Sequence, residues 1–472
     1  MHDFYLHGIV LENTSNCEIN TNVLSDCSVI YQGAIALYAG SERNTISSNE
    51  IHRLHEGFGI MVHTSDNNTI IGNNVSSNLF GVRLLNSNEN SVLNNEASNN
   101  TVGIHVSNSS FNEISDNVAS DTYLYYNMYF GNGILLDGGS TQNYVFNNTV
   151  NNNQIGICVD AESLIVGVPT DTSDNDIVQN KAVNNYVGIA IKGYMGNSAN
   201  NVSFNTVNQS LINTNGYQGH GIELSDTNWN IVDSNYVNDN QGDGIRLESS
   251  HNNSVTFNQI WSTSSWIREE NSLDNYIADN IFNGFSQISP IFINDTMAGM
   301  NWTITTSESW CSGTGTFADP YVIENVAVYG GGGNTNPITI LNSGNQTYFT
   351  IQNVVVTASG SSYDNAGIML MNVSNGNLNK ILAAGNGRTG IVMVNAYNIS
   401  IIECEMNDNA FAGIYVRNSS KVLSFNNTLK ENHEIGIMIK FSEGVSVEEN
   451  EIVSTGFFLR KDYDLSIGGS SI

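Results

Sequence analysis

Short stretches in which hydrophobic and polar residues alternate recur along almost the whole chain. Most begin with a glycine and a β-branched residue, as in "GIMVHT" from Gly59 and "GIRLES" from Gly244. Each stretch is only a few residues long and is bounded by Asn, Ser, Asp or Gly, which favour turns. Alternation with period two predicts short β-strands, and no window of 12 residues keeps the helical period.

The glycine-led units recur at a nearly constant spacing of 22 to 23 residues. They start at Gly8, Gly59, Gly81, Gly103, Gly133, Gly156, Gly188, Gly221, Gly244, Gly367, Gly390, Gly413 and Gly436, with looser copies at Gly33 and Trp266. A second element, Asn-x-apolar-x-x-Asn-x-apolar, recurs inside each period. Three short strands per repeat predict an all-β, right-handed parallel β-helix of about 15 coils. The LxxLxLxxN frame and helical half of a leucine-rich repeat are absent.

Asn is far more frequent than in an average protein, and most copies fall between the predicted strands. Asn tolerates the left-handed backbone conformation and can hydrogen-bond to the coils above and below. The repeat therefore predicts stacked Asn side chains at its turns.

These units resemble the parallel β-helix repeat of NosD-like periplasmic proteins and of carbohydrate-binding and sugar-hydrolase (CASH) domains. The resemblance covers nearly the whole chain and implies the fold, while many functions share that fold. It also implies a link to copper-site assembly. The 9 His and 11 Met of this chain are dispersed, so copper binding does not follow from its residues.

The regular repeat stops near residue 298. The segment "WCSGTGTFADPYVIENV" (310–326) is similar to the entry segment of archaeal NosD-like β-helices. We therefore expect a first β-helix at 1–297, a linker and cap at 298–335, and a second β-helix at 336–472. One continuous helix with an elaborate insertion is the alternative. No signal peptide is recognisable and both ends look cut, so we expect the chain to be part of a longer surface protein.

Composition narrows the range of partners. The net charge is −30, with 45 acidic against 15 basic residues, which disfavours nucleic acid and anionic membranes and leaves sugars or cations. No run of 18 apolar residues predicts a membrane span. The five cysteines (Cys17, Cys27, Cys158, Cys311 and Cys404) are scattered and are expected to be small buried hydrophobes; only Cys17 and Cys27 are near enough in sequence to bridge.

Gly219-His220-Gly221 resembles the Gly-His-Gly of polygalacturonases, and Gly244-Ile245-Arg246 resembles the coil that follows it there. Glu248 stands where that family has lysine. The preceding coils carry Tyr186-Val187 and Gln154-Ile155 where it has its carboxylates. Because inverting hydrolysis needs a general acid and a general base, hydrolysis at this point is disfavoured.

When the coils are aligned on their glycines, His220 stacks on Asp243, and Glu223, Arg246 and Arg268 form a charged ladder. A polysaccharide lyase or epimerase needs a base near cations that neutralise a uronate carboxylate. These five residues are the candidate catalytic set. The alternative is a self-neutralising ion ladder on an exposed sheet.

Three long periods must contain loops, and two of these loops lie just before the glycine, on the side of His220. Their aromatic residues are candidates for stacking on sugar rings: Tyr123, Tyr125, Tyr126, Tyr129 and Tyr217. A third loop carries Asp171, Asp174 and Asp176, a weak candidate Ca²⁺ site that lacks the spacing of an EF-hand. No cofactor is required by this sequence.

Together these observations predict an extracellular or cell-surface β-solenoid that acts as a structural, adhesive or carbohydrate-binding module. Its partner would be a polysaccharide or a cell-surface glycan. The alternative is a polysaccharide lyase, epimerase or hydrolase with a groove across residues 133–268. Several Asn-x-Ser/Thr sequons, such as those at Asn67 and Asn398, would allow glycosylation.

Overall fold

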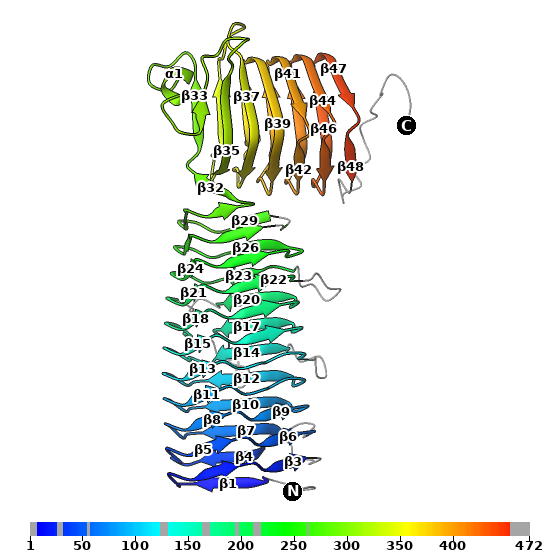
Figure 1. The fold of residues 1–472 in the computed structure, drawn as a ribbon. Helices are drawn as coiled ribbons and strands as arrows, with labels where there is room; N and C mark the ends of the chain where they lie inside the picture. The colour runs from blue at the N-terminus through cyan, green and yellow to red at the C-terminus, as the bar shows by residue number, and fades with distance from the viewer. Residues whose placement is uncertain are drawn as a thin grey trace. The chain divides into compact units, whose positions relative to one another are not determined.

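A computed structural model describes residues 7–25, 32–53, 57–122, 131–162, 170–193, 198–210, 219–261, 263 and 265–453. The chain divides into two compact units, unit 1 (Met1–Ile288) and unit 2 (Ser289–Ile472). Both are parallel β-helices built almost wholly from strands (Figure 1). The domain boundaries expected from the sequence, at 297 and 335, stay predictions.

Sheet 1 of unit 1 has 11 parallel strands, one from each successive coil. They are β1 (Ile9–Glu12), β4 (Gly33–Tyr38), β7 (Phe58–His63), β10 (Phe80–Leu85), β12 (Val102–Ser107), β14 (Asn132–Asp137), β17 (Ile155–Asp160), β20 (Val187–Lys192), β23 (Ile222–Ser225), β26 (Asp243–Glu248) and β29 (Ser265–Glu270). These strands contain the glycine-led units of the repeat.

Sheet 2 also has 11 strands, each three residues long. They are β2 (Glu18–Asn20), β5 (Thr45–Ser47), β8 (Thr69–Ile71), β11 (Ser91–Leu93), β13 (Glu113–Ser115), β15 (Tyr144–Phe146), β18 (Asp176–Val178), β21 (Asn201–Ser203), β24 (Ile231–Asp233), β27 (Ser254–Thr256) and β30 (Tyr276–Ala278).

The third side of unit 1, sheet 3, is less regular. Its strands are β3 (Val23–Ser25), β6 (Glu50–His52), β9 (Asn74–Ser76), β16 (Thr149–Asn151), β19 (Lys181–Val183), β22 (Thr206–Asn208), β25 (Tyr236–Asn238), β28 (Gln259–Trp261) and β31 (Ile281–Phe282). Between β9 and β16 the pairing continues as single bridges through Glu96 and Val118. β32 (Phe285–Ile288) pairs antiparallel with β31.

The glycine of each unit is required by how closely the coils approach. A Cβ on Gly81 would lie 2.5 Å from the carbonyl oxygen of Gly103, closer than real side chains come to backbone. The position is filled by Trp266 only in β29, which ends sheet 1. Stacked isoleucines such as Ile60, Ile104 and Ile134 then fill the interior and are fully buried.

Buried asparagines form ladders inside the turns, as the sequence predicted. The Oδ1 of Asn90 accepts hydrogen bonds from both the backbone N–H and the side-chain amide of Asn68, and Asn90 donates in the same way to Asn112. A second ladder runs through Asn73 and Asn95. Each bond contributes on the order of 1 kcal/mol, and together they fix the spacing of the coils.

Unit 2 has a six-stranded sheet 4 of β33 (Ile291–Asn294), β36 (Ile338–Leu341), β38 (Ala366–Met371), β40 (Thr389–Val394), β43 (Ala412–Arg417) and β46 (Ile435–Lys440). Its other strands form sheet 5: β34 (Cys311–Ser312), β35 (Tyr321–Tyr329), β37 (Phe349–Thr357), β39 (Ser374–Ala384), β41 (Tyr397–Ile402), β42 (Glu405–Asn407), β44 (Ser420–Phe425), β45 (Thr428–Lys430), β47 (Glu443–Glu448) and β48 (Glu451–Val453).

A single short helix, α1 (Trp302–Thr305), occurs among the described residues and begins unit 2. Trp302 stacks on Tyr321 with 4.9 Å between ring centroids and donates a hydrogen bond to Ser343 Oγ at 2.8 Å. Because the ring is fully buried, it fills the interior of the first coils of unit 2.

The predicted fold class is confirmed. Sheets 1 and 4, with one strand per coil, contain 11 and six strands in the described residues, slightly more than the 15 coils expected. Cys158, Cys311 and Cys404 are buried and unbridged, while Cys17 is only partly buried. Cys27 lies outside the described residues. No described helix is long and apolar enough to cross a membrane.

Candidate functional site

The outward-facing side chains of sheet 1 fall into three columns defined by their position relative to the glycine. The first column lies just before the glycine, the second two residues after it, and the third four residues after it. The second column runs Met61, Arg83, His105, Leu135, Cys158, Ala190, Glu223, Arg246 and Arg268 in paired register. The register predicted from Cys158 to Arg268 is therefore confirmed.

His220 and Asp243 are in contact, as the alignment predicted. The backbone N–H of Asp243 donates to Nδ1 of His220 at 3.0 Å, and one Asp243 carboxylate oxygen lies 3.4 Å from the same nitrogen. Only a protonated Nδ1 would gain from that carboxylate, but the hydrogen bond already uses the Nδ1 lone pair. Burial lowers the pKa of His220, with Asp243 and Glu223 opposing the shift, so we assign a neutral ring protonated on Nε2.

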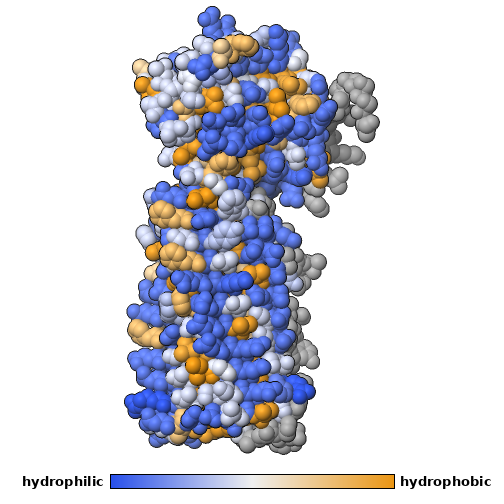
Figure 2. Space-filling model, viewed as in Figure 1, coloured by the Kyte–Doolittle hydropathy of each residue, from blue (hydrophilic) through white to orange (hydrophobic). Residues whose placement is uncertain are grey.

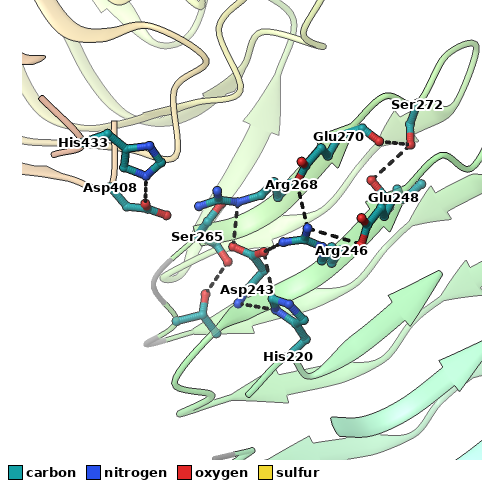
Figure 3. Close-up of polar contacts among 12 residues, drawn as sticks. His220, Asp243, Arg246, Glu248, Ser265, Arg268, Glu270, Ser272, Asp408 and His433 are labelled. Atoms are coloured by element: carbon teal, nitrogen blue, oxygen red, sulfur yellow. Dashed lines mark hydrogen bonds and ion pairs between the residues drawn. The ribbon is translucent and has the colours of Figure 1, made fainter. Parts of the chain in front are cut away.

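Asp243 is the centre of an ion-pair network (Figure 3). Its Oδ1 accepts from Nε of Arg268 at 3.0 Å, and its Oδ2 lies 3.6 Å from Arg246. Arg246 also donates to Glu270 at 2.7 Å and lies 3.3 Å from Glu248. Asp243 and Arg246 are largely buried, whereas the two glutamates are much more exposed.

This arrangement limits what the five candidate catalytic residues can do. Three carboxylates surround two guanidinium groups, and Glu223 adds a fourth one rung away from Arg246. The surroundings are therefore acidic and would repel a uronate. The lone pair that His220 would need as a base is already in use. The catalytic roles of His220, Asp243, Arg246, Arg268 and Glu223 stay predictions, and the geometry matches the self-neutralising ion ladder.

A second buried polar cluster lies earlier on the same face and was missed by the sequence analysis. His105 Nε2 is 3.0 Å from Asp137 Oδ1, and both side chains are fully buried. One coil before, Arg83 lies over the rings of Phe58 and Phe80 at 4.9 and 5.2 Å. The signal was present at second-column positions, in "GVRLLN" and "GIHVSN".

Arg83 remains charged in this setting. Burial lowers its pKa to about 10, and the charge of Asp137 opposes the shift. Its Nε and one terminal nitrogen are buried without a hydrogen-bond partner. The cation is therefore held mainly by two aromatic faces and by the charge of Asp137.

The predicted aromatic wall and calcium site have different outcomes. Tyr123, Tyr125, Tyr126, Tyr129 and Tyr217 all lie outside the described residues. Asp171, Asp174 and Asp176 are described and exposed, and Asp176 accepts a hydrogen bond from Asn201. Burial and the charge of Asp174 raise the pKa of Asp171. No group of three or more His, Cys, Asp or Glu suited to a metal occurs in the described part of the chain, and calcium binding stays a prediction.

A set of exposed large hydrophobic residues lies on sheet 2 and its flanking turns, in the coils from β21 to β30. We call it the aromatic surface; its members are Phe204, Trp229, Ile231, Phe257 and Tyr276. Trp229 is 64% exposed, and Phe204 and Phe257 are 59% and 57% exposed. Figure 2 shows hydrophobic patches along the edge of unit 1 where β18, β21 and β24 are labelled in Figure 1.

Three of these residues have a backbone conformation that aromatic side chains rarely adopt. Phe204, Trp229 and Phe257 have φ angles of 55°, 60° and 54°. Equivalent turn positions in other coils carry Asn, Asp, Gln or Gly, for example Asn147 and Gly72. The left-handed region costs an ordinary residue on the order of 1–2 kcal/mol, and an exposed ring recovers little of that by burial. Folding alone does not explain these rings.

The repeat also matches known protein families. Residues 7–166 match the family model described as "Right handed beta helix region", and residues 170–317 and 323–472 match the model described as "Periplasmic copper-binding protein (NosD)". The second match covers well over half of the chain. No curated protein matches it.

Solved structures share the coil architecture at low identity. A periplasmic alginate epimerase is 12% identical, with 89% of this chain and 77% of that chain covered and a TM-score of 0.32. A Dettilon tailspike protein is 13% identical over 83% of this chain and 62% of that chain, with a TM-score of 0.36. A Paenibacillus alginate lyase is 15% identical over 57% and 91%, with a TM-score of 0.28. No activity follows from likenesses of this size.

Proposed function

Because the chain belongs to the NosD family of β-helix proteins, we propose that it works outside the cytoplasm as a β-helix module that binds neutral polysaccharide on the aromatic surface of unit 1. The family description is periplasmic, and this supports the location. The observation that carries the binding proposal is the set of exposed aromatic rings at left-handed turn positions.

The spacing of the rings suits a polymer that runs along the coils. Phe204 and Phe257 occupy the same turn position two coils apart, with Ser234 between them. At about 4.8 Å per coil, the two rings are roughly 9.6 Å apart. Trp229 lies on the intervening coil at the preceding turn. A sugar chain along this edge would meet an aromatic face in successive coils.

The polar side chains around the rings favour a neutral sugar over an anionic one. Asp233 and Thr256 lie on the strands between the turns, and their side chains hydrogen-bond to each other. Such groups bond to hydroxyls while rings stack on C–H faces. The net charge of −30 would repel an acidic polymer from an edge that offers no cation among these residues.

Copper is not part of this proposal. The family description names copper, but the described residues contain no group of three or more His, Cys, Asp or Glu placed to hold a metal. The buried cysteines are far apart in sequence and unbridged. These residues do not fit a copper centre.

The test begins with a glycan array on the purified chain, with and without Ca²⁺, followed by product analysis on each hit. The best neutral ligand is then titrated by calorimetry against Trp229→Ala, Phe204→Asn and Phe257→Asn. Each variant is expected to weaken binding about tenfold, which corresponds to about 1.4 kcal/mol.

Phe111→Asn is the matched control. Phe111 is also exposed, with a φ of 59°, but its coil lies four coils before that of Trp229. The control should relieve the same backbone strain and leave affinity unchanged. The proposal is wrong if no neutral glycan binds, or if Phe111→Asn weakens binding as much as Phe204→Asn. Release of products from a bound glycan would favour the alternative of a polysaccharide-cleaving enzyme.

A further inference from the structure

Unit 2 contains two arginines whose neighbours are aromatic rather than acidic. Arg388 immediately precedes β40, and Arg417 is the last residue of β43. Both are half-buried, and Nε of each is buried without a hydrogen-bond partner. In the described part of unit 2, the ion pairs join Lys430 to Glu451 and His433 to Asp408, so neither arginine is neutralised by a described carboxylate.

Aromatic rings hold these cations in place. The Arg388 guanidinium lies 4.3 Å from the ring centroid of Phe411 and 5.7 Å from that of Tyr363. Tyr415 connects the two arginines, because its hydroxyl interacts with both Tyr363 and Arg417. Burial raises the pKa of Tyr415, Tyr363 raises it further, and Arg417 opposes the shift. Tyr363 itself is 58% exposed, which leaves an open ring face beside Arg388.

A third cation continues the row. Lys440 pairs in register with Arg417 on the next coil, about 4.8 Å away along the stack. It is exposed and has no ion pair among the described residues. Unlike the arginines of unit 1, the cations of this row lack intervening carboxylates. We call Arg388, Arg417, Lys440 and Tyr363 the basic patch.

We propose that the basic patch binds the carboxylate of an acidic sugar, with the ring of Tyr363 stacked on the sugar face. A guanidinium presents paired N–H groups that match the two oxygens of a carboxylate. The unsatisfied Nε atoms of Arg388 and Arg417 are donors that such a ligand would use. The exposed tyrosine supplies the apolar platform that a sugar ring needs and a small inorganic ion does not.

The charge of the whole chain decides against denser polyanions. Three cations within a protein of net charge −30 attract an anion only at close range, because the surrounding field is repulsive. Nucleic acid, with one charge per 1.7 Å of duplex, would bring many phosphates against acidic surface. A sugar chain with one carboxylate per ring places few charges there. This proposal does not depend on neutral-glycan binding by unit 1.

The test measures binding of a trisaccharide of galacturonic acid to the full chain by calorimetry at low salt. Its carboxyl-reduced, neutral form and inorganic sulfate serve as comparison ligands. Arg388→Met and Arg417→Met should each weaken binding of the acidic trisaccharide at least tenfold. Lys430→Met removes a cation of the same unit that is already paired with Glu451, and should change affinity less than twofold.

Four outcomes would overturn the proposal: no binding of the acidic trisaccharide, equal binding of its neutral form, unchanged affinity in both arginine variants, or inorganic sulfate competing as tightly as the sugar. Loss of folding in the arginine variants is checked by far-ultraviolet circular dichroism, and Tyr363→Ala gives an independent variant at an exposed position. Trp229→Ala should leave acidic-sugar binding intact, so failure here is distinguishable from failure of the neutral-glycan proposal.

Discussion

Unit 1 and unit 2 each place two arginines on the outer face of the same kind of sheet, with opposite surroundings. In unit 1, Arg246 and Arg268 contact Asp243, and Arg246 also contacts Glu270. In unit 2, Arg388 faces rings and Arg417 lies beside Tyr415. The fourth residue after the repeat glycine is Glu248 in one coil of unit 1 and Arg417 in unit 2, so one strand position serves opposite charges.

The difference shows that the coil position of a charged residue does not set its role. What matters is which residues stand on the neighbouring rungs, about 4.8 Å away. Acidic rungs neutralise Arg246 and Arg268 and make that cluster part of the scaffold. Aromatic rungs stabilise Arg388 by cation–π contact and leave its hydrogen-bond donors available.

The largest effect is expected when the centre of the unit 1 cluster is removed. Asp243→Ala takes away the buried carboxylate between Arg246 and Arg268 and should lower the free energy of unfolding by about 3 kcal/mol. Urea unfolding followed by circular dichroism measures it. Adding Arg268→Met to the same chain should recover part of the loss, because one uncompensated cation is removed as well. A loss below about 1 kcal/mol would show that ion pairing does not hold this cluster.

A smaller effect is expected from pH. Burial lowers the pKa of His220 in the folded state, against Asp243 and Glu223 and together with Arg246 and Arg268. The unfolded chain therefore binds the proton more readily, and the stability due to the neutral ring is present above pH 6.5 and is lost as pH falls below it. The native chain should lose more stability between pH 7.5 and pH 5.5 than His220→Asn, by on the order of 1 kcal/mol. Equal losses in both chains would show that His220 is not responsible.

The smallest effect is expected from the unit 2 arginines. Arg388→Met and Arg417→Met remove cations that have no described carboxylate partner, so no buried charge is left behind. Each should change the free energy of unfolding by less than about 0.5 kcal/mol. Arg246→Met in unit 1 is the comparison and should cost more, since it leaves Asp243 and Glu270 with one partner fewer. If the unit 2 variants cost as much, those arginines belong to the scaffold too.

Much of the fold and part of the site were predictable from the sequence. The glycine-led repeat predicted the strands of sheets 1 and 4, and the recurring Asn predicted the ladders through Asn68 and Asn90. Aligning the coils on glycine also brought His220 to Asp243 and Glu223 to Arg246. These predictions succeeded because stacking fixes each residue against its equivalent in the next coil.

The protonation of His220 and the saturation of Arg246 were not predictable. They depend on where a backbone N–H points and on how far the side chains of Glu248 and Glu270 reach. The aromatic surface was overlooked because Phe204 and Trp229 occupy turn positions where most coils carry polar residues, and only φ angles and exposure reveal them as exceptions.

The sequence by itself determined the β-helix, its register and which residues share a column, because a repeat of nearly constant length makes equivalent positions neighbours. Only the tertiary structure decided which columns are buried, which cations are neutralised and which rings stay exposed. Those properties depend on side-chain reach and burial across several coils, and in Arg83 and His105 they turned outward-facing repeat positions into an almost wholly buried polar cluster.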